Sequence, residues 1–181
     1  MRKHPDPRGP RWRDALIVVL SFYLCIGILV FYSGHANGAT LTWHQRWALA
    51  YSRQAGREYG TTMQAIVYQE SSFCALKNWR YKKDKYSYGC AQVQRATVAR
   101  VLHLDVTIRT LRTDDHLNIE LGAAYLRYCI RVTGSWMRGV YCYNHGPYAS
   151  IHASWHTLAH DSYVLAIQKR MQQVEEWRRV R

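Results

Sequence analysis

Residues 61–73, which read TTMQAIVYQESSF, decide the fold. Thr61 or Thr62 is expected to cap the start of a helix, because threonine is a good N-cap residue. The apolar face of that helix recurs at helical spacing and consists of Met63, Ile66 and Val67. The segment therefore predicts a helix that ends at Glu70, with a carboxyl group at the end of an apolar face.

Outward from this segment, the chain predicts further helices and one irregular excursion. Residues 77–92 lack helical periodicity and alternate aromatic with charged residues, which is typical of a loop or a short β-hairpin. Asp114 and Asp115 favour the start of a long helix, and Gly134 favours its end. Other helices are expected at residues 42–58, 94–103, 135–144 and 161–179. We therefore expect an α+β fold that is mainly α, as a single domain over residues 42–181.

The composition excludes a disordered chain and indicates an anionic partner. Of the 181 residues, 48% are hydrophobic and 20% are charged, which suffices for a packed core. Lys and Arg number 25 against 12 Asp and Glu, so the net charge is +13. Such a basic chain is expected to bind nucleic acid, a lipid surface or an acidic polymer such as the bacterial cell wall.

An uncharged segment near the N-terminus predicts a membrane anchor. Residues 15–32, ALIVVLSFYLCIGILVFY, carry no charge, and a helix of this length spans about 27 Å, enough to cross a membrane. Residues 1–14 are basic and residues 33–41 form a neutral linker. We therefore expect a single-pass inner-membrane protein with a cytoplasmic N-terminus and a periplasmic domain. Cleavage after the small residues 36–38 is the alternative, which the length of the apolar run disfavours.

Four of the five cysteines lie in the part expected outside the membrane, and they predict disulfides. They are Cys74, Cys90, Cys129 and Cys142. No pair has the CxxC spacing of a zinc site, so two disulfides with three alternative connectivities are expected. A turn at Gly134 can bring Cys129 and Cys142 together, so we favour that pair, with Cys74 bonded to Cys90.

Four blocks of the sequence, in order, resemble those of lytic transglycosylases of the soluble (SLT) type. They are AIVYQESSF at 65–73, SYGCAQV at 87–93, NIELGAAYL at 118–126 and VYCYNHGP at 140–147. The family patterns are QESSF, GxxQ, NIxxGxxYL and AYNAGP, and the resemblance covers about residues 60–165. Two features depart from the family. Cys90 and Cys142 replace the usual hydrophobic residues, which suggests that disulfides brace the cleft, and the segment between Ser72 and Gly89 is unusually basic.

The resemblance implies a lysozyme-like fold and an enzyme that cleaves peptidoglycan between N-acetylmuramic acid and N-acetylglucosamine. It implies that Glu70 is the sole catalytic acid/base, and it implies no metal or cofactor. It further implies a sugar cleft lined by Gln92, Tyr143 and Asn144. From the same blocks, Ser71, Ser87 and Gly89 are expected to contact the substrate.

Glu70 also suits this chemistry on its own. Cleavage of a glycosidic bond near neutral pH needs a protonated carboxyl close to the leaving oxygen. Its neighbours Tyr68 and Phe73 favour burial, which we expect to raise the pKa of Glu70. Asp84 lies in a cationic run, and Glu120 is expected to be a buried structural partner of backbone groups or a cation. A single carboxyl predicts a lyase that closes a 1,6-anhydro ring, and a lysozyme-type hydrolase using Asp84 is the alternative.

Other functions fit the sequence less well. His152, His156 and His160 recur at helical spacing, but no HExxH motif accompanies them, so no metal site is expected. The positive charges are spread along an exported chain, which disfavours a nucleic-acid partner. Glu70 disfavours a non-catalytic wall-binding scaffold subunit. Both a bacterial envelope-spanning assembly and phage lysis or entry remain open as contexts. Of four aromatic residues near the last block, only Tyr143 is expected at the site, the others being Trp136, Tyr141 and Tyr148.

Overall fold

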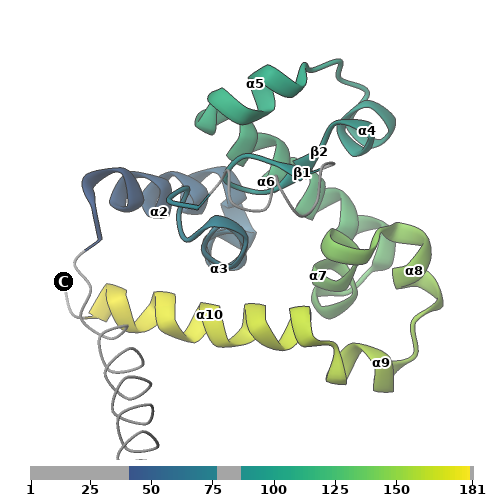
Figure 1. Cartoon of the computed structure of the whole chain (residues 1–181). Helices are drawn as coiled ribbons and strands as arrows, with labels where there is room; N and C mark the ends of the chain where they lie inside the picture. The colour runs from purple at the N-terminus through teal and green to yellow at the C-terminus, as the bar shows by residue number, and fades with distance from the viewer. Residues whose placement is uncertain (1–40, 77–86, 180–181) are drawn as a thin grey trace, which may run out of the picture. The chain divides into compact units, whose positions relative to one another are not determined.

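Helix α3 (Gly60–Ser71) lies between two other helices, α2 (Trp43–Gly56) and α10 (Ser162–Arg179), as Figure 1 shows. The computed structural model describes residues 41–76 and 87–179. The predicted apolar face of α3 is confirmed, because Met63, Ile66 and Val67 are fully buried. The helix that carries Glu70 is therefore enclosed by the core along most of its length.

The predicted threonine cap of α3 is wrong. The helix begins at Gly60, directly after the 3-10 turn η1 (Arg57–Tyr59), with no side chain capping it. A Cβ atom on Gly60 would lie 2.7 Å from the Arg53 carbonyl oxygen, so only glycine allows this close turn between α2 and α3. The threonines bond to later helices instead: Thr61 donates to Glu175, and Thr62 accepts from the Trp136 indole.

Helix α10 packs along α3 on the side opposite α2. The Arg170 guanidinium lies 4.3 Å from the centre of the Tyr68 ring and donates to the Gln69 side chain. Trp177 contacts the rings of Tyr68 and Phe73. These aromatic and charged contacts attach the last helix of the chain to the turn of α3 next to Glu70.

A small antiparallel hairpin follows α3. Strand β1 (Ser87–Tyr88) pairs with β2 (Val93–Gln94), with Ser87 opposite Gln94 and Tyr88 opposite Val93. The predicted β excursion is present in this form. Residues 77–86, which contain the basic run and Asp84, lie outside the described residues.

Short helices connect the hairpin to the longest helix of the domain. Helix α4 (Arg95–Thr97) continues into a π-helical segment, η3 (Val98–Leu102), and α5 (Ile108–Thr113) follows. Helix α6 (Asp115–Thr133) is capped by the Asp114 carboxylate, which accepts from the Leu117 backbone N–H, and ends at Gly134 in a left-handed conformation. The bounds predicted from Asp114 and Gly134 are confirmed, whereas α5 was not predicted.

Three helices lead from α6 to α10. They are α7 (Trp136–His145), α8 (Pro147–His152) and α9 (Trp155–His160). Gly139 lets α7 approach α6, since a Cβ there would lie 2.3 Å from the Ile130 side chain. Gly146-Pro147 ends α7 as predicted, but the two short helices after it were not expected. In the described residues the fold is mainly helical with one two-stranded sheet.

The Asn118 side chain joins the hairpin to the helices. Its amide nitrogen donates to the carbonyl oxygens of Tyr88 (2.8 Å) and Leu111 (3.0 Å), and its oxygen accepts from the Ala91 N–H (2.8 Å). Gly89 has φ +77°, and a Cβ on it would meet the Asn118 amide at 2.3 Å. The fully buried Asn118 therefore satisfies three backbone groups, two in the hairpin and one in α5.

Two disulfides flank the hairpin and α6. Cys74 is bonded to Cys90, and Cys129 on α6 is bonded to Cys142 on α7. These are the pairs that the sequence analysis favoured. Cross-links closing loops of this length stabilise a domain by about 2–4 kcal/mol each.

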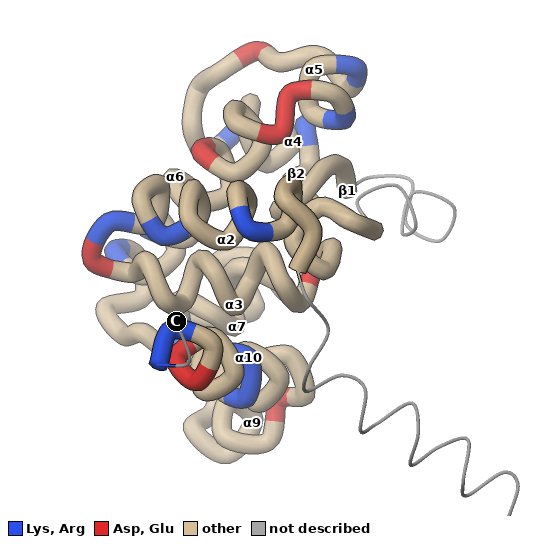
Figure 2. The backbone as a smooth tube through the Cα atoms, turned by 90° about the vertical axis from the view of Figure 1, so that its left-hand side faces the viewer, with Lys and Arg blue, Asp and Glu red and all other residues tan. Residues whose placement is uncertain are grey.

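The membrane anchor predicted at residues 15–32 lies outside the described residues, and so do its flanks 1–14 and 33–41 except for residue 41. Within residues 41–76 and 87–179, no helix is sufficiently long and apolar to span a membrane. Figure 2 shows Lys and Arg residues on α5, α6 and α10, so the positive charge of the described residues is not gathered on one element.

Replacing Asn118 with alanine should lower the free energy of unfolding by about 3 kcal/mol, because three buried backbone groups lose their partner. Thermal unfolding followed by circular dichroism measures this effect. The exposed Gln54→Ala variant on α2 is the control and should change stability by less than about 0.5 kcal/mol. Equal melting temperatures for the two variants would contradict the role given to Asn118.

Candidate active site

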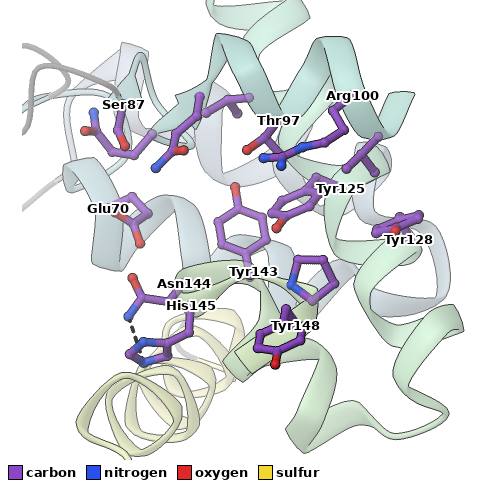
Figure 3. A pocket seen from close by; sticks show the side chains of 16 residues that line it. Glu70, Ser87, Thr97, Arg100, Tyr125, Tyr128, Tyr143, Asn144, His145 and Tyr148 are labelled. Atoms are coloured by element: carbon purple, nitrogen blue, oxygen red, sulfur yellow. Dashed lines mark hydrogen bonds between the residues drawn. The ribbon is translucent and has the colours of Figure 1, made fainter. Parts of the chain in front are cut away.

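A cleft of about 520 Å³ opens between the end of α3, the hairpin, η3 and helices α6 to α8. Figure 3 shows its walls, with Glu70, Ser87 and Asn144 at one end and Arg100 and Tyr128 towards the other. Its lining residues are Glu70, Ser87, Gln92, Val93, Gln94, Thr97, Arg100, Val101, Tyr125, Tyr128, Tyr143, Asn144, His145, Gly146, Pro147 and Tyr148. The volume falls within the range of ligand pockets, about 300–1,000 Å³.

Glu70 lies in the last turn of α3 and is 7% exposed. It is the only Asp or Glu among the described residues that line the cleft. The chain reverses directly after this turn, because Ser72, Phe73 and Cys74 all have positive φ. This reversal ends the helix at the cleft wall and leaves the Glu70 carboxyl facing the cleft, as Figure 3 shows.

Ser71 and Gly89 were expected to contact substrate, but neither lines the cleft. Ser71 is buried, and its hydroxyl donates to the Cys90 carbonyl (2.7 Å) and accepts from the Cys74 N–H (2.9 Å). Ser71 thus holds the reversed segment against the hairpin, beside the Cys74–Cys90 disulfide. Gly89 forms the hairpin turn over Asn118, where there is no room for a side chain.

Ser87 and Gln92, also expected from the sequence, do line the cleft. Both side chains are nearly buried. Gln92 has a left-handed backbone (φ +50°), and its side-chain nitrogen donates to the Gly89 carbonyl at 2.7 Å. The hairpin turn therefore fixes the Gln92 amide in the cleft wall.

Tyr143 projects from α7 towards the hairpin, and its hydroxyl donates to the Ala91 carbonyl at 2.8 Å. Burial raises the pKa of Tyr143 well above its usual value, and the negative charge of Glu70 and the neighbouring Tyr125 raise it further. Tyr143 is therefore a neutral phenol close to the Glu70 carboxyl. Gly122 makes room for it, since a Cβ at Gly122 would lie 2.9 Å from the Tyr143 hydroxyl.

Asn144 follows Tyr143 and is exposed at the cleft wall. The His145 Nε2 atom lies 3.3 Å from the Asn144 amide nitrogen and 3.1 Å from the Asp161 carboxylate. The other oxygen of Asp161 accepts from the N–H groups of Tyr163 and Val164 at the start of α10. This chain of contacts links the Asn144 end of the cleft to the final helix.

Three further tyrosines line the cleft: Tyr125 and Tyr128 were not considered as site residues from the sequence, and Tyr148 was not expected at the site. Tyr125 and Tyr128 stand one helical turn apart on α6, and Tyr148 on α8 is 79% exposed. Burial raises the pKa of Tyr125 to about 12. Tyr125 lies in the block at residues 118–126 that resembles the family, and this position was the sequence signal that could have placed it at the site. Trp136 and Tyr141 lie outside the cleft wall, as expected, whereas Tyr148 belongs to it.

The prediction that Glu120 is buried is wrong. The buried positions of α6 include Asn118, Ile119 and Leu121, and Glu120 falls on the remaining, exposed face of the helix. Its carboxylate accepts a hydrogen bond from the Tyr51 hydroxyl at 2.9 Å. Glu120 therefore joins α6 to α2 at the surface and does not reach the cleft.

The three histidines considered as metal ligands do not share a helix. His152 ends α8, whereas His156 and His160 belong to α9, where their rings stack 4.3 Å apart. A second group consists of His44, Cys74 and Asp115, within 4.8 Å of one another. Because the sulfur of Cys74 is committed to a disulfide, this group lacks a thiolate ligand.

The comparisons with known proteins agree with this geometry. The chain matches the family described as Transglycosylase SLT domain over residues 50–161, from within α2 to the residue directly before α10. No curated protein and no solved structure matches the chain significantly. The family match covers more than half of the chain and contains the whole cleft wall. The chain therefore belongs to the transglycosylase SLT domain family and is a lytic transglycosylase of peptidoglycan.

Proposed function

We propose that this protein cleaves the β-1,4 bond between N-acetylmuramic acid and N-acetylglucosamine without consuming water, and that it leaves 1,6-anhydromuramic acid ends. The observation that carries the proposal is that Glu70 is the only carboxyl group among the described residues of the cleft wall. One carboxyl can act first as acid and then as base, whereas hydrolysis with two carboxylates requires a second one facing the first.

In this mechanism the Glu70 carboxyl donates its proton to the bridging oxygen, and the bond from that oxygen to C1 of muramic acid breaks. The N-acetyl carbonyl of the same sugar stabilises the positive charge at C1. The Glu70 carboxylate then accepts the proton of the O6 hydroxyl, and O6 bonds to C1. The proton lost in the first step is regained in the second, so the enzyme ends unchanged.

The surroundings of Glu70 support its role as an acid. It is nearly excluded from water, and transfer of a carboxyl group out of water disfavours its charged form. The neutral Tyr143 phenol beside it adds no charge. Gln92, Ser87 and Asn144 supply amide and hydroxyl groups along the same wall, suited to the N-acetyl and hydroxyl groups of a sugar.

Two alternatives remain distinct from this proposal. A lysozyme-type hydrolase would use Asp84, which lies outside the described residues, as a second carboxylate. A non-catalytic scaffold subunit would bind the wall through the same cleft but would not need an acid at position 70.

Glu70→Gln should reduce the clearing of purified cell-wall sacculi by at least about 100-fold, because an amide cannot donate the proton. A turbidity assay with matched melting curves measures the loss. Glu58→Gln, at an exposed glutamate outside this cleft, removes the same charge and should keep full activity. Clearing by Glu70→Gln at the rate of the control would exclude Glu70 as the acid.

The products separate a lyase from a hydrolase. Mass spectrometry of digested peptidoglycan should find muropeptides that are lighter by one water than lysozyme products and that carry no new reducing ends. Asp84→Asn should then cost little activity. Reducing-end muramic acid as the main product, together with loss of activity in Asp84→Asn, would assign a hydrolase.

For the cellular setting, we propose that residues 15–32 anchor the protein in the inner membrane, with residues 1–14 in the cytoplasm. Residues 33–41 would then link the anchor to a periplasmic domain over residues 42–181. The uncharged run and the basic residues before it support this topology. A domain held at the membrane would open the wall locally, as an envelope-spanning assembly or phage lysis or entry requires.

A reporter fused to the C-terminus should be active in the periplasm, and carbonate extraction should leave the full-length protein in the membrane fraction. The apolar segment is expected to remain in the bilayer because nothing else compensates its transfer to water. A soluble product that begins near Ala39 would show instead that the segment is a cleaved signal.

A further inference from the structure

Arg100 stands in the cleft wall at a distance along it from Glu70. It is exposed and lies in the middle of η3, next to Thr97 and Tyr125 in Figure 3. Segments of π-helix are rare and occur frequently at functional sites. Among the described residues, Arg100 is the only Lys or Arg that lines this cleft. The described part of the cleft wall therefore has one acidic side chain at one end and one basic side chain towards the other.

The charge of Arg100 is not neutralised by a carboxylate of the described residues. Nearby Arg95 pairs with Asp105 at 3.1 Å, and Arg178 pairs with Glu175, but no ion pair within residues 41–76 and 87–179 includes Arg100. The one acid in the described cleft wall is Glu70, on α3. A guanidinium that lines a ligand cleft without such a partner is placed to bind an anion.

The protein beneath Arg100 is a firm support. Tyr125, the Cys129–Cys142 disulfide and the partly buried Val101 and Tyr128 form a separate apolar cluster between η3 and α6. The positive charge of Arg100 lowers the pKa of Tyr125, against the larger effect of burial, so the guanidinium and this phenol are close neighbours. Tyr125 and Tyr128 stack with a ring separation of 6.2 Å. The cluster fixes the segment that carries Arg100, which limits the entropy lost on binding.

Peptidoglycan carries an anion at a regular position, on every second sugar. Each muramic acid bears a lactyl group whose carboxyl is either free or joined to a stem peptide that has free carboxylates of its own. We propose that Arg100 binds a carboxylate of the peptidoglycan strand and thereby selects wall glycan over neutral amino-sugar polymers. This inference rests on the proposed function, since it assumes that the same cleft holds the glycan strand.

Binding to the full-length protein tests the inference without turnover. In the Glu70→Gln background, affinity would be measured for glycan strands with stem peptides and for strands from which an amidase has removed the peptides. The N-acetylglucosamine hexasaccharide, which has no carboxylate, is the third ligand. Arg100→Gln should weaken binding of at least one carboxylate-bearing strand by about tenfold, the effect of one charge-assisted hydrogen bond. Binding of the hexasaccharide should stay within about twofold.

The two strands distinguish the source of the carboxylate. Loss confined to peptide-bearing strands assigns a stem-peptide carboxylate, and loss confined to stripped strands assigns the free lactyl group. Loss on both shows that either is accepted. Arg100→Lys should bind the carboxylate-bearing strand more tightly than Arg100→Gln does. The affinity of the protein with unaltered Arg100 should fall more steeply with salt concentration than the affinity of Arg100→Gln.

Arg109→Gln is the matched control, because Arg109 is an exposed arginine on α5 outside the cleft wall. Equal losses in Arg109→Gln and Arg100→Gln would show a general effect of net charge and overturn the proposal. Equal weakening of the neutral hexasaccharide would overturn it as well. If the protein with unaltered Glu70 fails to release anhydro-muropeptides, the proposed function is refuted. The binding data would still decide the role of Arg100.

Discussion

The buried side-chain amide of Asn118 makes three hydrogen bonds that fix the hairpin wall of the cleft to the helices. Two of these bonds go to the hairpin, at Tyr88 and Ala91, and the third goes to Leu111 in α5, so this side chain of α6 satisfies backbone groups of both elements. Ala91, which donates to Asn118, in turn accepts from the Tyr143 hydroxyl through its carbonyl. Gln92 is the next residue. The position of this part of the cleft wall relative to α6 and α7 thus depends on a residue that does not line the cleft.

The long elements could be predicted from the sequence because their signals are local. The apolar spacing of α3, the Asp114 cap and the Gly134 stop each lie within one helix. Helices α5, α8 and α9, of six residues each, are too short to show a period. The predicted start of α3 was wrong for another reason. The close turn at Gly60 begins the helix before the two threonines, whose preference for the N-cap position is therefore not used. The prediction that Glu120 is buried failed because Glu120 lies on the exposed side of α6, outside the arc of its buried residues.

The candidate site was predictable where it rests on contiguous motifs, as at Glu70, Gln92 and the pair Tyr143-Asn144. Arg100 and the two tyrosines of α6 were not predicted, because only the packing of η3 on α6 brings them to the cleft. Ser71 shows the opposite failure. It belongs to a motif that carries the acid, yet its hydroxyl serves the backbone of the reversed segment beside that acid.

Helix α10 lies wholly beyond residue 161, where the family match ends, and yet it completes the packing around α3. Arg170 and Trp177 cover Tyr68, and Arg178 donates to the otherwise buried Gln64. A fragment cut at the family boundary would leave this aromatic and amide surface open to water directly behind Glu70. Such a fragment would expose an apolar surface that favours aggregation, and the turn of α3 that carries Glu70 would lose its packing partner. The packing around α3 therefore extends beyond the residues that match the family.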